Sequence, residues 1–263
     1  LRFTIGGREL FMNNVKHILD SKILAHEGCY LVSRMDLSKI LDPILRPRNI
    51  RNARRVNTVI IDPGHGGDDS GAENRYGREK DYNLKVARLL RKKLEADGLK
   101  VVMTRDADVT LSSAERVKIA NRIPDAIFIS IHFKSNSDPL KEGIETFTLP
   151  VALPDMKPRK GNSNDQANIV LASSAHSRCL LMTGRPDGGV GRANISVLAD
   201  LRHPAILIAG GYMSHAIEAR IITRDSYQQT LAKAIASAVA DYSVATTGRM
   251  PRPEPKPKPE PAI

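Results

Sequence analysis

The feature that most constrains the fold is an alternation, from Val56 onward, of short apolar runs with stretches of helical periodicity. Residues 58–61 and 126–131 are the apolar runs expected of strands buried on both faces of a sheet. Between them, apolar residues over 84–94 recur at helical spacing, and Gly98 follows where such a helix should end. The pattern predicts an α/β fold: a mostly parallel twisted sheet with helices on both faces.

The chain divides into three parts on this pattern. Residues 1–50 form a small β-rich N-terminal module or domain remnant, residues 56–246 form the main domain, and residues 247–263 form a proline-rich disordered tail that a proline-recognising partner could bind. Residues 150–163 are predicted to be a loop. Further strands are predicted at 1–5, 29–33, 100–104, 143–148, 195–198 and 205–208, and helices at 36–41, 112–121, 165–182, 216–222 and 225–243.

The net charge of +11 favours either simple solubility or attraction to a polyanion: nucleic acid, anionic lipid or an anionic cell wall. Aromatic residues are scarce and no nucleic-acid motif is present, so we expect no nucleic-acid partner. We interpret a basic cluster before the first core strand as a solvated linker. The cluster consists of Arg46, Arg48, Arg51, Arg54 and Arg55.

Other composition signals exclude several classes of protein. No apolar run approaches the ~20 residues of a transmembrane helix, so no membrane span is expected. Cys29 and Cys179 fall in different predicted parts of the chain and predict neither a disulfide framework nor a cysteine zinc site. Residue 1 is Leu and no charged-then-apolar leader follows it, which favours a mature or trimmed form.

Three residues of metal-ligating type lie at the ends of two predicted strands and just before a predicted helix. His65 follows the strand at 58–61 among glycines, His132 ends the strand at 126–131, and Glu79 lies in a loop just before a helix. The carboxyl ends of parallel strands are where ligands bind in such sheets. Two imidazoles and one carboxylate form the His₂Glu set of a catalytic zinc site with an open fourth position. Ordinary polar residues at strand ends, or a phosphate-binding turn at residues 64–67, remain alternatives.

The run from Ile60 to about Tyr242 resembles the zinc-dependent N-acetylmuramoyl-L-alanine amidases that cleave bacterial peptidoglycan. The resemblance implies that His65, Glu79 and His132 bind Zn²⁺, that peptidoglycan is the substrate, that residues 56–246 are the catalytic domain, and that the protein is exported, periplasmic or wall-associated. The matching motifs are Ile61-Asp62-Pro63-Gly64-His65-Gly66-Gly67, Glu79-Lys80-Asp81, Thr104-Arg105-Asp106, Glu115-Arg116, Ala120-Asn121, Ser130-Ile131-His132, Gly143-Ile144-Glu145-Thr146 and Pro204-Ala205-Ile206-Leu207-Ile208.

The sequence departs from the family pattern at two positions. Ala209 stands where the family usually has the glutamate that acts as general base, a group worth about 10²–10⁴ in rate. Lys134 stands where the family more often has Asn or Ala. Glu145 could replace the missing base, although a structural carboxylate is its simpler role. We therefore expect a weakened amidase, with a catalytically silent wall-binding protein or another zinc peptidase as alternatives.

Overall fold

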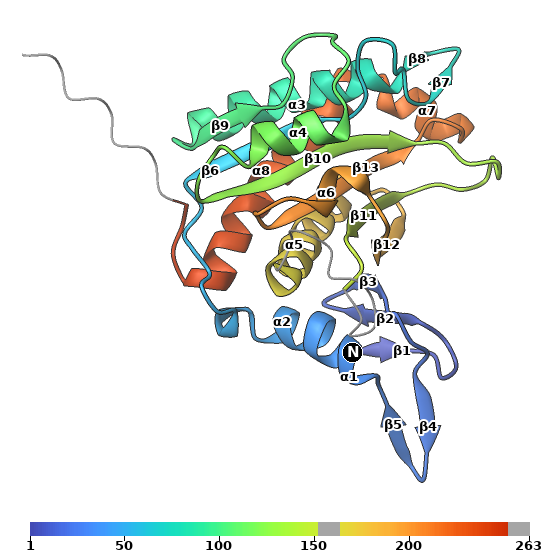
Figure 1. Ribbon diagram of the computed structural model, residues 1–263. Helices are drawn as coiled ribbons and strands as arrows, with labels where there is room; N and C mark the ends of the chain where they lie inside the picture. The colour runs from blue at the N-terminus through green and yellow to red at the C-terminus, as the bar shows by residue number, and fades with distance from the viewer. Residues whose placement is uncertain (152–163, 252–263) are drawn as a thin grey trace, which may run out of the picture.

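The computed structural model describes residues 1–151 and 164–251 and centres on a nine-stranded sheet with the order β1-β2-β3-β12-β11-β13-β10-β6-β9 (Figure 1). Strands β9, β6, β10 and β13 pair in parallel, β11 runs antiparallel to β13, and β12 and β3 continue in parallel with β11. The main-sheet strands are β1 (Arg2–Phe3), β2 (Glu9–Met12), β3 (Val15–Ile18), β6 (Thr58–Pro63), β9 (Lys100–Met103), β10 (Ala126–Lys134), β11 (Ile144–Thr148), β12 (Asp187–Arg192) and β13 (Ala205–Tyr212).

Helices cover both faces of this sheet, which confirms the predicted fold class. One face packs against α3, α5 and α8 through a large apolar core, and the other packs against α4 and α6 through a smaller one. The helices are α1 (Arg34–Asp36), a π-helical turn (Leu37–Leu41), α2 (Asp42–Leu45), a 3₁₀ turn (Pro47–Asn49), α3 (Glu79–Ala96), α4 (Ser113–Ala120), α5 (Asp165–Thr183), α6 (Ser196–Ala199), α7 (Ala216–Ile222) and α8 (Asp225–Thr247).

The N-terminal residues extend the main sheet. Strands β1, β2 and β3 are antiparallel, as expected of a β-rich module, and β3 joins β12 through the pair His17–Val190. A separate hairpin, β4 (Leu24–His26) and β5 (Cys29–Leu31), projects beyond the sheet (Figure 1). A second two-stranded hairpin, β7 (Glu73–Asn74) and β8 (Gly77–Arg78), leads into α3.

One predicted strand is wrong. Ile195 is the N-cap of the short helix α6, and residues 196–198 lie in its single turn instead of a strand. The sheet position beside β11 is taken by β12, whose sequence Asp-Gly-Gly-Val-Gly-Arg has too few β-forming side chains for its composition to reveal it. Val197 and Leu198 bury their side chains in the smaller core, so their apolar character reflects packing and not strand formation.

Two predictions fall largely on residues that the structure does not describe. The expected loop at 150–163 is described only at residues 150 and 151, and the expected tail at 247–263 only up to Pro251. No helix of the described residues is long and apolar enough to cross a membrane.

Candidate metal centre

His65, Glu79 and His132 meet at the carboxyl edge of the parallel strands. Their potential ligand atoms all lie within 4.8 Å of one another. Glu79 Oε1 is 3.2 Å from His65 Nε2 and 2.9 Å from His132 Nδ1. The three residues predicted from the sequence therefore form one cluster that could hold a metal ion. Glu79 is the first residue of α3, so the expectation that it lies in a loop before the helix is wrong by one position.

The backbone around Glu79 holds its side chain as a carboxylate. The Phe133 N–H donates to Oε1 at 3.1 Å and the Ala72 N–H donates to Oε2 at 3.0 Å. Burial alone would raise the pKa of Glu79, but hydrogen bonds with His132 and His65 outweigh it and hold the pKa well below its usual range. A buried carboxylate between two imidazoles has the charge and donor atoms that a divalent cation requires.

Two glycines leave the space in which the ligands converge. A Cβ at Gly64 would lie 2.1 Å from His132 Cε1. A Cβ at Gly71, where φ is +67°, would lie 2.5 Å from His65 Cδ2 and 2.7 Å from Glu79 Oε2. Any side chain at either position would displace a candidate ligand. The two glycines therefore serve the geometry of the cluster, and not only the flexibility of a turn.

Asp69 contacts a candidate ligand and was not predicted from the sequence. His65 adopts a φ of 60°, and the Gly66 N–H donates to the Asp69 carbonyl at 2.8 Å, so this tight turn brings Asp69 back to its neighbour. Asp69 Oδ2 lies 2.8 Å from His65 Nδ1, which leaves Nε2 directed at Glu79. A carboxylate on the second ring nitrogen fixes the tautomer and orientation of a ligating histidine. The signal available in the sequence was an acid four residues after the histidine.

We expect Asp69→Asn to weaken zinc binding by about 10–100-fold, the usual effect of removing the partner of a ligating histidine. Competition with a zinc-chelating dye measures this affinity. Asp68→Asn is the matched control, because the exposed Asp68 side chain makes only a 3.5 Å contact with Thr110. Equal affinities of the two variants would show that Asp69 does not position His65.

A buried ion pair supports the loop that carries His65. Asp62 accepts hydrogen bonds from Arg116 Nη1 at 2.8 Å, from Thr104 Oγ1 at 2.6 Å and from Ser130 Oγ at 2.7 Å. Arg116 also donates to the His65 carbonyl at 2.7 Å. Arg105 supports the same region, because it donates to the carbonyls of Pro63, Gly64, Lys80 and Ala107.

Ala209 lies between His132 and Glu145 on three adjacent strands. It pairs with His132 in the parallel β10–β13 ladder and with Glu145 in the antiparallel β11–β13 ladder. Directly paired residues point to the same face of a sheet, so the three side chains share a face. Ala209 is fully buried and faces the smaller apolar core. The sequence position expected to carry the base therefore adjoins a candidate ligand but presents only a methyl group.

The Glu145 carboxylate is held by its neighbours. It forms ion pairs with Lys134 and, at 3.5 Å, with Lys141, and accepts a 2.7 Å hydrogen bond from the Tyr212 hydroxyl. Burial would raise the pKa of Glu145, but the Lys134 ammonium and the Tyr212 hydroxyl keep it below the ordinary value. Lys134 also lies 4.7 Å from the centre of the Phe147 ring. A carboxylate so engaged is a weak proton acceptor.

His215, close to Ala209 in sequence, caps the start of a helix. Its Nδ1 accepts from the Glu218 N–H at 3.3 Å at the start of α7. This contact engages the His215 ring in capping the helix.

The fold and the cluster define an α/β protein with a candidate metal site at the carboxyl edge of its sheet. Residues 59–241 match the N-acetylmuramoyl-L-alanine amidase family Amidase_3, and the chain belongs to this family of enzymes.

Curated relatives and solved structures agree with this membership. The chain is 36% identical over 186 residues to the putative N-acetylmuramoyl-L-alanine amidase YrvJ of Bacillus subtilis, covering 70% of this chain and 33% of that protein. It is 30% identical over 193 residues to the amidase LytC of the same organism, covering 73% and 37%. It therefore spans about a third of the length of these relatives. The amidase structure from Clostridium difficile 630 is 31% identical, with a TM-score of 0.63 and coverage of 72% and 97%.

Proposed function

We propose that this chain is a zinc-dependent peptidoglycan amidase with reduced turnover. Its reaction is hydrolysis of the amide between the lactyl group of N-acetylmuramic acid and L-alanine. The observation that carries the proposal is the His65–Glu79–His132 cluster at the carboxyl edge of an amidase sheet, with Ala209 paired directly to His132.

Zinc is the metal that this donor set favours. Two imidazole nitrogens and one carboxylate oxygen make a three-ligand set of the catalytic zinc type, and Gly64 and Gly71 leave room for the ligands to converge. A zinc ion bound there would lower the pKa of a water to about 7 and polarise the substrate carbonyl. The protein's own contribution is to fix the ligands: Asp69 orients His65, and the N–H groups of Phe133 and Ala72 orient Glu79.

With Ala209 at this position, the site lacks a general base that could transfer protons. Its methyl group can neither accept a proton from the attacking water nor give one to the leaving amine. The nearest carboxylate on the same face, Glu145, is held by two lysines and a tyrosine. We infer that turnover falls by about 10²–10⁴, the usual contribution of a general base.

The same observations favour one alternative, a protein that binds peptidoglycan without cleaving it. In that case Glu145 does not replace the missing base, because its carboxylate is held in an ion pair with Lys134. For both functions we propose that the protein acts outside the cytoplasm, in the periplasm or at the cell wall, with peptidoglycan as its partner.

Release of new amino termini from purified wall sacculi distinguishes these functions. We expect the zinc-loaded chain to sediment with sacculi and to release L-alanine amino termini slowly, and we expect His132→Ala to abolish release. Sedimentation with no release above the His132→Ala level identifies the silent binder. A chain that neither sediments with sacculi nor cleaves them contradicts both functions.

A further inference from the structure

A cavity of 1110 Å³ lies at the opposite edge of the sheet from the candidate metal centre. Its walls include Val56, just before β6, Ala126 and Ile127 at the start of β10, and Pro204, just before β13. These are the amino-terminal ends of the parallel strands, whereas His132 lies near the carboxyl end of β10. The cavity is therefore separate from the candidate active site.

Lysine and arginine side chains far outnumber acidic side chains in the lining of this cavity. Three of the arginines belong to the basic cluster that we interpreted from the sequence as a solvated linker. Asp125 is the one acidic side chain among the lining residues. The six basic residues of the cavity are Lys39, Arg51, Arg54, Arg55, Arg122 and Arg202.

Half of these cations are already neutralised or engaged. Lys39 pairs with Asp165 at 3.2 Å, Arg54 pairs with Asp125, and Arg55 donates to the backbone carbonyls of Met250 and Pro251. The other three, Arg51, Arg122 and Arg202, are exposed and have no acidic partner within residues 1–151 and 164–251. An uncompensated positive charge therefore remains around the opening.

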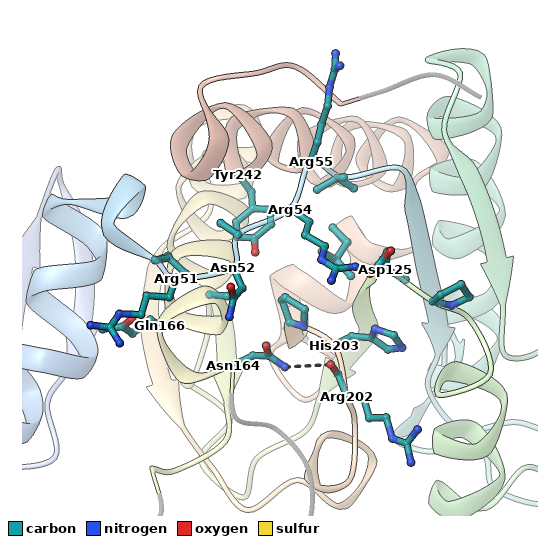
Figure 2. Close-up of a pocket in the computed structure, with 18 of the residues that line it drawn as sticks. Arg51, Asn52, Arg54, Arg55, Asp125, Asn164, Gln166, Arg202, His203 and Tyr242 are labelled. Carbon is teal, nitrogen blue, oxygen red and sulfur yellow. Dashed lines mark hydrogen bonds and ion pairs between the residues drawn. The ribbon is translucent and has the colours of Figure 1, made fainter. Parts of the chain in front are cut away.

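The cations are spread around the cavity and do not converge on one point. Figure 2 shows Arg51 and Arg202 extending outward on different sides of the cavity, while Arg54 pairs with Asp125. A single small anion could reach only one of these guanidinium groups, but a chain that carries charges at intervals could reach several.

The types of side chain in the lining restrict the chemical class of the ligand further. Five of the six cations are arginines, whose planar guanidinium groups bind phosphate oxygens in pairs. Tyr242 is the one aromatic residue of the lining, and only 3% of it is exposed, so it offers little surface for base stacking. None of the exposed large hydrophobic residues among the described residues lines the cavity, which argues against insertion into a lipid surface.

We propose that this cavity binds a linear phosphodiester chain without bases, through Arg51, Arg122 and Arg202. The ligand runs across the opening and pairs its phosphates with successive guanidinium groups. The proposal does not depend on hydrolysis at the metal centre, because the two sites lie at opposite edges of the sheet.

Fluorescence anisotropy with a labelled glycerol-phosphate oligomer tests this site on the full chain. The cavity variant combines Arg51→Gln, Arg122→Gln and Arg202→Gln. The control variant has the same net charge and combines Arg34→Gln, Lys92→Gln and Arg220→Gln, which are exposed residues outside the cavity lining. Binding is measured over a range of salt concentrations, and thermal melting confirms that both variants fold.

We expect the cavity variant to lose about tenfold or more in affinity, and the slope of log Kd against log salt to fall by about two. The control variant should stay within about twofold of the unaltered chain, since charge without position contributes little. No binding by the unaltered chain, or equal losses in both variants, overturns the site.

Three further probes identify the ligand chemistry. We expect inorganic phosphate not to compete at millimolar concentration, because it reaches one arginine at a time. A single-stranded oligonucleotide with the same number of phosphates should bind no tighter than the glycerol-phosphate oligomer; clearly tighter binding would overturn the proposal in favour of a nucleic acid. Inorganic polyphosphate separates anhydride from diester chains, and a preference for polyphosphate would overturn the diester assignment.

Discussion

Replacing Ala209 with glutamate is expected to raise the rate of peptidoglycan amide hydrolysis by about 10²–10⁴-fold, with little change in KM. The strand β13 delivers residue 209 to the candidate metal centre, in register with His132. A carboxylate there can take a proton from the attacking water, and this interaction acts mainly in the transition state. Release of amino termini from sacculi measures the rate, and Ala209→Gln is the matched control with the same shape and no titratable group.

Lys134 should limit the gain from this single substitution. Ala209 is fully buried, so a glutamate side chain there needs a partner. The Lys134 ammonium, which contacts Glu145 on the paired strand, is a candidate for that partner. A glutamate held in such an ion pair accepts a proton less readily. We expect the double variant Ala209→Glu with Lys134→Asn to be faster than the single variant. If Ala209→Glu is no faster than Ala209→Gln in either background, while zinc binding is intact, residue 209 is not the position of the base.

Replacing Arg116 with methionine is expected to destabilise the protein by about 3–5 kcal/mol, the usual effect of leaving one partner of a buried ion pair uncompensated. Asp62 is 1% exposed and its 2.8 Å ion pair with Arg116 is the one contact among its described partners that carries a positive charge. Arg116 also supports the His65 carbonyl, so the loss should reach the metal loop. Urea denaturation measures the free energy of unfolding.

Lys118→Met is the control for this stability prediction. Lys118 lies on the same helix, α4, and its side chain is exposed. Its replacement should change the free energy of unfolding by less than about 0.5 kcal/mol. A similar effect of the two substitutions would mean that the Asp62–Arg116 pair does not stabilise the loop.

Local signals in the sequence were enough to predict most of the fold. The helix predicted at 216–222 coincides with α7, because His215 caps its start, and the capping box at Ser112 and Glu115 marks the start of α4. Strand β12 was missed because its glycines carry no apolar pattern, and its place depends on pairing with β11 and β3, which are distant in sequence. Such long-range pairing has no local signature.

Only part of the candidate site likewise has a local signal in the sequence. His65, Glu79 and His132 could be predicted because each is a ligand-type residue at the end of an apolar strand or the start of a helix. The role of Asp69 depends on the left-handed turn at His65, which the residue types alone do not specify. The Lys134–Glu145 pair depends on β13 lying between β10 and β11, an order that only the sheet topology reveals.

Elemental analysis of the folded protein after dialysis tests the central claim most directly. Zinc bound by His65, Glu79 and His132 predicts about one zinc per chain in the unaltered protein and almost none in His132→Ala, with both chains folded. A chain that folds without zinc, or a zinc content that His132→Ala leaves unchanged, would contradict the assignment of this cluster as the metal centre of an amidase.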